Sequence, residues 1–159
     1  MDLLQNTPLL AALFAIFFAQ FVKIPIHFLL TRELDWKLMT STGGMPSSHS
    51  AAVSALTTAI AYEVGLDSPM FAVSAIFAVI VMFDATGIRY QAGQQALIIN
   101  QMRLDIQTFV TEVKGWPQKD GQQKILELKT LLGHKPSEVF AGSVTGILIS
   151  IITYTFIVA

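Results

Sequence analysis

Three long stretches of the chain carry almost no charged residues, and this most restricts how the chain can fold. They lie near residues 8–30, 69–84 and 137–158. A helix needs about 20 predominantly apolar residues to cross the hydrocarbon core of a bilayer. Only 13% of all residues are charged, against about 25% in soluble domains. The pattern predicts an all-α integral membrane protein.

A shorter apolar stretch, residues 48–64, is rich in Ala, Ser and Thr, which allow membrane helices to approach closely. We therefore predict four transmembrane helices, near 8–30, 48–64, 69–84 and 137–158, in a single membrane domain spanning 1–159. Gly142 and Gly146 have GxxxG spacing, and faces of this kind suit a homodimer. Lys23 either reaches the membrane surface or faces a polar interior, and Pro25 should kink or end its helix near residue 21.

The polar insertion 86–136 separates the third and fourth predicted spans. Its apolar spacing predicts an amphipathic helix over 92–113 and a shorter one over 122–132, ending at Gly133. Seven of the ten basic residues lie between Arg89 and Lys135. The positive-inside rule therefore places the insertion in the cytoplasm and both termini outside, with the protein in the cell (inner) membrane. Because the chain has no cysteine, it has no disulfide, thiolate nucleophile or Cys-based metal site.

The segment 43–51, Gly-Gly-Met-Pro-Ser-Ser-His-Ser-Ala, has the composition of a loop entering a helix. Free backbone N–H groups and the positive end of the helix dipole gather at such a terminus and favour anions. Ser47, Ser48 and His49 add hydroxyl and imidazole groups. The alternative interpretation is an ordinary serine-rich helix cap.

The predicted topology brings further ionisable residues to the same side of the membrane. Cations with free N–H groups bind phosphate, and two histidines with an orienting carboxylate can transfer it. A metal site is a competing hypothesis, because histidines and carboxylates also bind hard or borderline cations. Several of these residues can also be explained without a functional site. Asp84 and Arg89 could form a structural ion pair, and His134 could make a hydrogen bond at a helix junction. Glu138 could complement a helix dipole, and His27 could lie at the membrane interface. The residues concerned are Lys23, Arg32, His49, Asp84, Arg89, His134 and Glu138.

Three separate motifs carry a resemblance to a known family. They are the segment 43–51, Val81-Met82-Phe83-Asp84-Ala85 with Gly87-Ile88-Arg89, and Gly133-His134-x-Pro136-x-Glu138. In this order they resemble the divergent type 2 phosphatidic acid phosphatase family, which is related to acid phosphatases and vanadium-dependent haloperoxidases. The resemblance covers essentially the whole chain.

The parent superfamily has the motifs Lys-x6-Arg-Pro, Pro-Ser-Gly-His and Ser-Arg-x5-His-x3-Asp. Lys23 and Arg32 would correspond to the first motif, with eight intervening residues and Glu33 in place of proline. Residues 46–49 match the second, with serine for glycine. Arg89, His134 and Glu138 would correspond to the third, which the long insertion interrupts.

The resemblance implies a membrane-embedded phosphatase that hydrolyses a lipid phosphate monoester or diphosphate through a phosphohistidine. His134 would be the nucleophile, Glu138 would orient it, and His49 would protonate the leaving alcohol. Asp84 would brace Arg89 or a histidine. No metal or cofactor is implied, and the implied partners are a phosphorylated lipid and the membrane, with no nucleic acid. The alternative is a non-catalytic protein that binds or transports phosphorylated lipids in the same pocket. The implied phosphate-binding residues are Lys23, Arg32, Ser47, Ser48 and Arg89.

Overall fold

The computed structural model describes residues 5–41, 43–112 and 132–158, and these residues form helices joined by short connections. No strand occurs in these ranges, which confirms the all-α prediction. The elements are α1 (Thr7–Thr31), the 3-10 helix η2 (Trp36–Thr40), α2 (Ser48–Val64), α3 (Pro69–Thr86), α4 (Ile88–Glu112), α5 (Pro136–Thr153) and the π-helical turn η3 (Tyr154–Val158).

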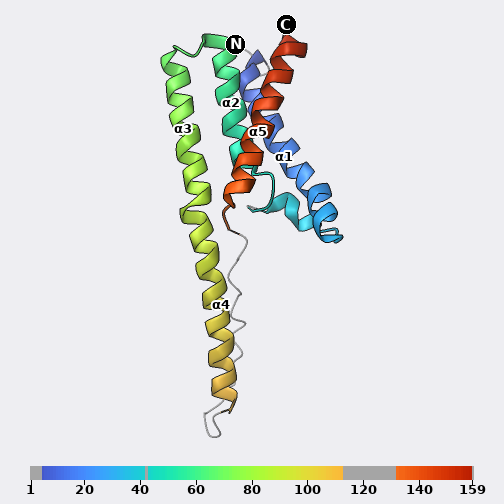
Figure 1. The fold of residues 1–159 in the computed structure, drawn as a ribbon, viewed down its shortest axis with the longest axis vertical. Helices are drawn as coiled ribbons and strands as arrows, with labels where there is room; N and C mark the ends of the chain where they lie inside the picture. The colour runs from blue at the N-terminus through green and yellow to red at the C-terminus, as the bar shows by residue number, and fades with distance from the viewer. Residues whose placement is uncertain (1–4, 42, 113–131, 159) are drawn as a thin grey trace.

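Helix α2 lies at the centre of a bundle and contacts α1, α3 and α5 (Figure 1). Helix α4 continues α3 beyond Gly87 and extends past the end of the bundle (Figure 1). The two ends of the chain lie together at the opposite end of the molecule (Figure 1). The start of α2, the end of α3 and the start of α5 therefore share one end of the bundle, the end from which α4 extends.

Three helical stretches are long and apolar enough to cross a membrane: Thr7–Thr31, Pro69–Phe109 and Pro136–Ile157. Helix α2, with 17 residues, is not among them, so the four-span topology stays a prediction. The amphipathic helix expected over 92–113 falls on α4, and its place at the membrane surface also stays a prediction. Residues 122–131 of the second expected helix lie outside the described ranges.

Of the kink or end expected near residue 21, the structure excludes the end. The helix continues to Thr31 with Pro25 inside it. Proline removes one backbone donor, but membrane helices tolerate this where neighbouring groups compensate. The buried Lys23 and Ile24 keep α1 packed against the bundle up to the residue before the proline. The helix ends instead at Arg32, whose φ of 62° is left-handed and whose N–H donates to the Phe28 carbonyl.

Small residues at every fourth position let the bundle helices approach closely. A Cβ on Gly142 would collide with the Ser47 carbonyl, and one on Gly146 with the Ala51 carbonyl. Ser150 Oγ donates to the Ala55 carbonyl oxygen at 2.6 Å. The GxxxG pair therefore packs α5 on α2 within one chain. The buried small residues are Ala11, Ala15 and Ala19 of α1, Ala51, Ala55 and Ala59 of α2, and Gly142, Gly146 and Ser150 of α5.

Candidate functional site

The first turn of α2 forms one side of the candidate site, and contacts to α5 hold it. The Ser47 side chain caps the helix by accepting the Ser50 N–H at 3.3 Å, and it also accepts the Ser50 hydroxyl at 3.0 Å. The Ser47 N–H donates to the Glu138 carbonyl at 2.9 Å. The backbone N–H groups of Ser48 and His49 have no acceptor among the described residues. These two amides, and not the Ser47 amide, are open to an anion.

His134 lies two residues before the start of α5 and is 1% exposed. Its Nδ1 lies 3.1 Å from Glu138 Oε2, which also accepts the Lys135 N–H at 3.1 Å. A carboxylate at Nδ1 favours the proton on that atom, which leaves a lone pair on Nε2. His134 Nε2 is buried and has no hydrogen-bond partner in the described part of the chain. With Nδ1 next to Glu138, Nε2 is the ring nitrogen of His134 that remains without a partner.

The ring of His49 faces this histidine. The two ring centroids are 6.1 Å apart with an interplanar angle of 61°. His49 is the second residue of α2 and is exposed, whereas His134 is buried. The groups that act electrostatically on His49 include His134, Arg89, Lys23 and Asp84. The structure therefore brings His49 and His134 together, with charged groups of α1 and of the α3–α4 junction within electrostatic range of His49.

Asp84 and Arg89 form an ion pair across Gly87, with Arg89 Nε 2.5 Å from Asp84 Oδ2. Their side chains are 38% and 55% exposed. Of the two roles expected for Asp84, the structure shows the contact with Arg89. The pair bridges α3 and α4 and holds the guanidinium at the site end of the bundle.

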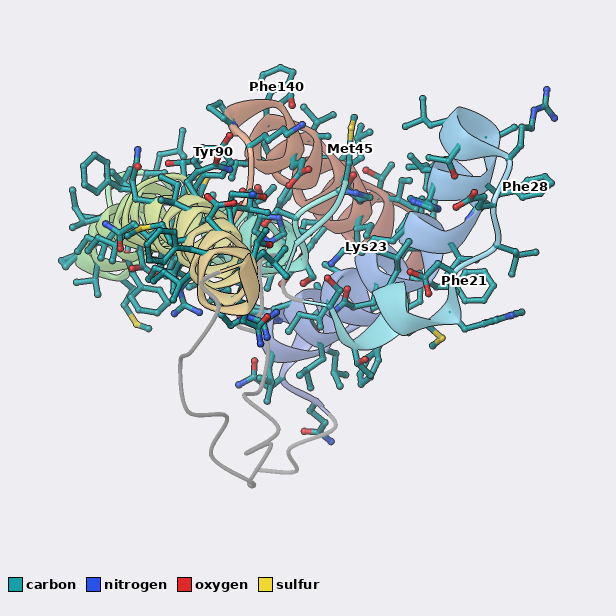
Figure 2. The ribbon with its side chains drawn as sticks, turned by 90° about the horizontal axis from the view of Figure 1, so that it is seen from below. Phe21, Lys23, Phe28, Met45, Tyr90 and Phe140 are labelled. Carbon is teal, nitrogen blue, oxygen red and sulfur yellow. The ribbon has the colours of Figure 1, made fainter. Side chains whose placement is uncertain are left out.

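Lys23 points into the protein and does not reach for the membrane surface. It is 1% exposed, and its Nζ donates to the carbonyl oxygens of Ser41 at 3.2 Å and Gly43 at 2.9 Å. Figure 2 shows Lys23 directed to the interior, near the loop that carries Met45, whereas Phe21 and Phe28 point outward. Lys23 therefore contacts the loop before α2.

Among the interactions of the described residues, Arg32 has none with the histidine pair. Arg32 is exposed at the end of α1, nine residues beyond Lys23, which corresponds to about 13 Å along a helix axis. His27 lies on the same end of α1, where its Nδ1 is 3.2 Å from both the Thr31 hydroxyl and the Glu33 carbonyl oxygen. His27 thus caps a helix end, in agreement with its interfacial interpretation.

Sequence reasoning missed how His134 is positioned. The His134 N–H donates to the Ala85 carbonyl oxygen at 2.9 Å. Gly133 has a φ of 76°, and a Cβ there would collide with the backbone of Arg89 and Tyr90. Both contacts fix the chain before α5 against the α3–α4 junction. A glycine directly before a candidate nucleophile is the signal that could have indicated this close approach.

The metal hypothesis and the hollows of the surface were the other places to look for a site at this end of the bundle. Among the described residues, no group of three or more His, Asp or Glu residues is placed to hold a metal ion, so the metal hypothesis gains no support from them. A shallow apolar hollow of about 470 Å³ lies on α3, and a second of about 330 Å³ involves Glu63 at the opposite end. Neither hollow reaches the histidine pair.

Comparisons with known proteins agree with the resemblance seen in the motifs. The model of the Divergent PAP2 family matches residues 4–149. The chain is 58% identical over 156 residues to the protein named "Uncharacterized membrane protein YuiD" of Bacillus subtilis (strain 168), covering 98% of this chain and 99% of that one. No solved structure matches. This protein is therefore a membrane protein, and it belongs to the Divergent PAP2 family.

Proposed function

We propose that the protein is a membrane phosphatase that hydrolyses a lipid phosphate at the His49–His134 pair. The observation that carries the proposal is the environment of the two ring nitrogens of His134. Its Nε2 is buried without a partner, its Nδ1 contacts Glu138, and the His49 ring lies 6.1 Å away. Near-attack geometry requires reacting atoms about 3–3.5 Å apart, and the proximity of the two rings would let both act on the same bound phosphoryl group.

The proposed reaction uses these two histidines and Glu138. His134 Nε2 attacks phosphorus, an N–P bond forms, and the P–O bond to the lipid breaks as His49 gives a proton to the leaving oxygen. Water then attacks the phosphohistidine and loses a proton to His49, and the N–P bond breaks to release inorganic phosphate. Glu138 holds the Nδ1 proton and stabilises the positive charge on the imidazole in both steps.

Two kinds of group support the binding of a lipid phosphate. Arg89 and the open amides of Ser48 and His49 can bind the phosphoryl oxygens. Large apolar side chains next to the polar groups are exposed and would contact the lipid chains, which a water-soluble ester lacks. These side chains are Met45 at 40%, Phe83 at 74%, Ile88 at 72% and Phe140 at 71% exposure.

The test compares the three histidines of the chain. Wild type, His134→Ala, His49→Ala and His27→Ala are reconstituted in lipid nanodiscs, and phosphate release is measured from phosphatidic acid and from an isoprenyl diphosphate. Loss of a general acid costs about 10²–10⁴-fold, and loss of the nucleophile should cost at least as much. His27→Ala is the matched control and should keep wild-type turnover. Equal phosphate release by wild type and His134→Ala on both lipids would refute the proposal.

The second candidate is a non-catalytic protein that binds phosphorylated lipids. Two contacts favour it: Lys23 and the Ser47 N–H both donate to carbonyl oxygens of the protein. In a phosphatase of this superfamily, the first two motifs, to which these residues correspond, would bind phosphate instead. This candidate predicts equal retention of phosphatidic acid by wild type and His134→Ala, without phosphate release from either.

A further inference from the structure

The side chain of Lys23 occupies an interior position that its helix imposes. Ala11, Ala15 and Ala19 precede it at four-residue intervals, and they are 3%, 0% and 0% exposed. Residues at this spacing share one face of a helix. Lys23 continues the face that packs against α2 and α5, so its ammonium group must find partners inside the protein.

The partners of Lys23 are backbone carbonyl oxygens of one loop. Nζ donates to Gly43 O at 2.9 Å and to Ser41 O at 3.2 Å. An ammonium group has three donors, so two of them are committed to the loop. The lysine stem also lies under the loop, since its Cδ is 3.8 Å from the point where a Cβ of Gly44 would lie.

This loop leads directly into the first turn of α2. From Gly43 the chain reaches the cap residue Ser47 in four residues, and Ser47 donates its N–H to the Glu138 carbonyl oxygen. The entry to α2 is thus held from α1 by Lys23 and from α5 by Glu138. His49 follows two residues after the cap, and its position relative to His134 depends on both anchors.

We propose that Lys23 is a positioning residue, which fixes the loop before α2 and thereby holds His49 opposite His134, and that it is not a ligand of the phosphoryl group. The role differs from the phosphate-binding role that the motif resemblance implies. Its structural part is independent of the proposed phosphatase function, whereas its kinetic part rests on that function.

The test uses Lys23→Met, which keeps the length of the side chain but cannot donate. Amide hydrogen exchange is measured in nanodiscs without ligand. Because hydrogen bonds to a charged group are lost, exchange of the bonded amides in residues 43–49, those of Gly43 and Ser47, should accelerate about tenfold to a hundredfold. Amides around Ala55 and Ser150 serve as the internal control and should keep their protection. Unchanged exchange over 43–49 would overturn the proposal.

The kinetic arm separates positioning from phosphate binding. Lys23→Met should lower kcat by more than tenfold and change KM for phosphatidic acid and inhibition by orthovanadate by less than about threefold, because the misplaced group is the general acid. A loss of orthovanadate affinity with normal exchange would instead identify Lys23 as a phosphate ligand. Absence of phosphate release by wild type would remove the phosphatase function but leave the exchange result standing.

Lys23→Gln is the second variant, in case the buried methionine prevents folding. Its amide is neutral and can still donate to one carbonyl oxygen of the loop. Positioning predicts a smaller rise in exchange over 43–49 than a complete loss of donors would cause, with orthovanadate inhibition nearly unchanged. If Lys23 instead binds phosphate directly, the loss of its charge in Lys23→Gln should weaken the binding of orthovanadate at least about tenfold. That result would contradict the proposal.

Discussion

At the scale of single residues, Glu138 connects the parts of the site. Its carboxylate accepts from His134 and from the Lys135 N–H, and its carbonyl oxygen accepts from Ser47. The sequence motif predicted the partnership of Glu138 with His134. It could not predict the bond to Ser47, because that bond depends on how closely Gly142 allows α5 to approach α2. Arg32 was placed at the site by motif order alone, and its position in the structure is the exposed end of α1.

Replacing Glu138 by glutamine tests its role in catalysis. The amide keeps the size of the side chain, but it cannot stabilise the imidazolium as a carboxylate does, and its NH2 group can turn toward Nδ1 and move the ring proton to Nε2. We expect phosphate release to fall about tenfold to a thousandfold, less than in His134→Ala. Turnover is measured together with thermal unfolding. Wild-type turnover in Glu138→Gln would show that Glu138 only caps α5.

At the scale of the elements, the sequence predicted helix positions well because apolar length and helix caps are local properties. The expected span 48–64 coincides with α2, and 69–84 and 137–158 differ from the helices by a few residues. The in-line continuation of α3 into α4 was not predicted. The third span was expected to end near residue 84 and the insertion to begin at residue 86, but the Gly87 N–H still donates to the Phe83 carbonyl oxygen, so one long helical stretch results.

The close contact of α2 with α5 should control the stability of the bundle. In Gly146→Leu, the new side chain has no room against the backbone of Ala51 and Ala55, so the helices must separate. Overpacking costs about 1–3 kcal/mol where side chains can adjust, and backbone contacts adjust less. We expect a loss above about 3 kcal/mol, measured as a fall in the detergent unfolding temperature. Phe156→Ala, at an 80% exposed position, is the control and should change stability little.

At the scale of the whole molecule, the helix ends that share one side of the bundle could be derived from alternation alone. Successive spans reverse direction, so the start of α2, the end of α3 and the start of α5 must meet at one end, and the structure places them there (Figure 1). The convergence of His49 and His134 follows from this order. The separation of 6.1 Å does not, because it is determined by the small residues that set the distance between helices.

The orientation of the molecule in the membrane is the remaining prediction at this scale. Basic residues concentrate in the insertion and are absent from the turn between α2 and α3, so the positive-inside rule places α4 in the cytoplasm and Leu66 outside. The chain has no native cysteine, so single cysteines can be introduced directly. In intact cells, a membrane-impermeant maleimide should label Leu66→Cys, and it should label Gln107→Cys only after permeabilisation. Both positions are exposed in the structure. Labelling of both cysteines from the same side would show that α3 does not cross the membrane. Labelling of Gln107→Cys alone in intact cells would place the histidine pair on the outer surface. The pair would then act on lipids of the outer leaflet.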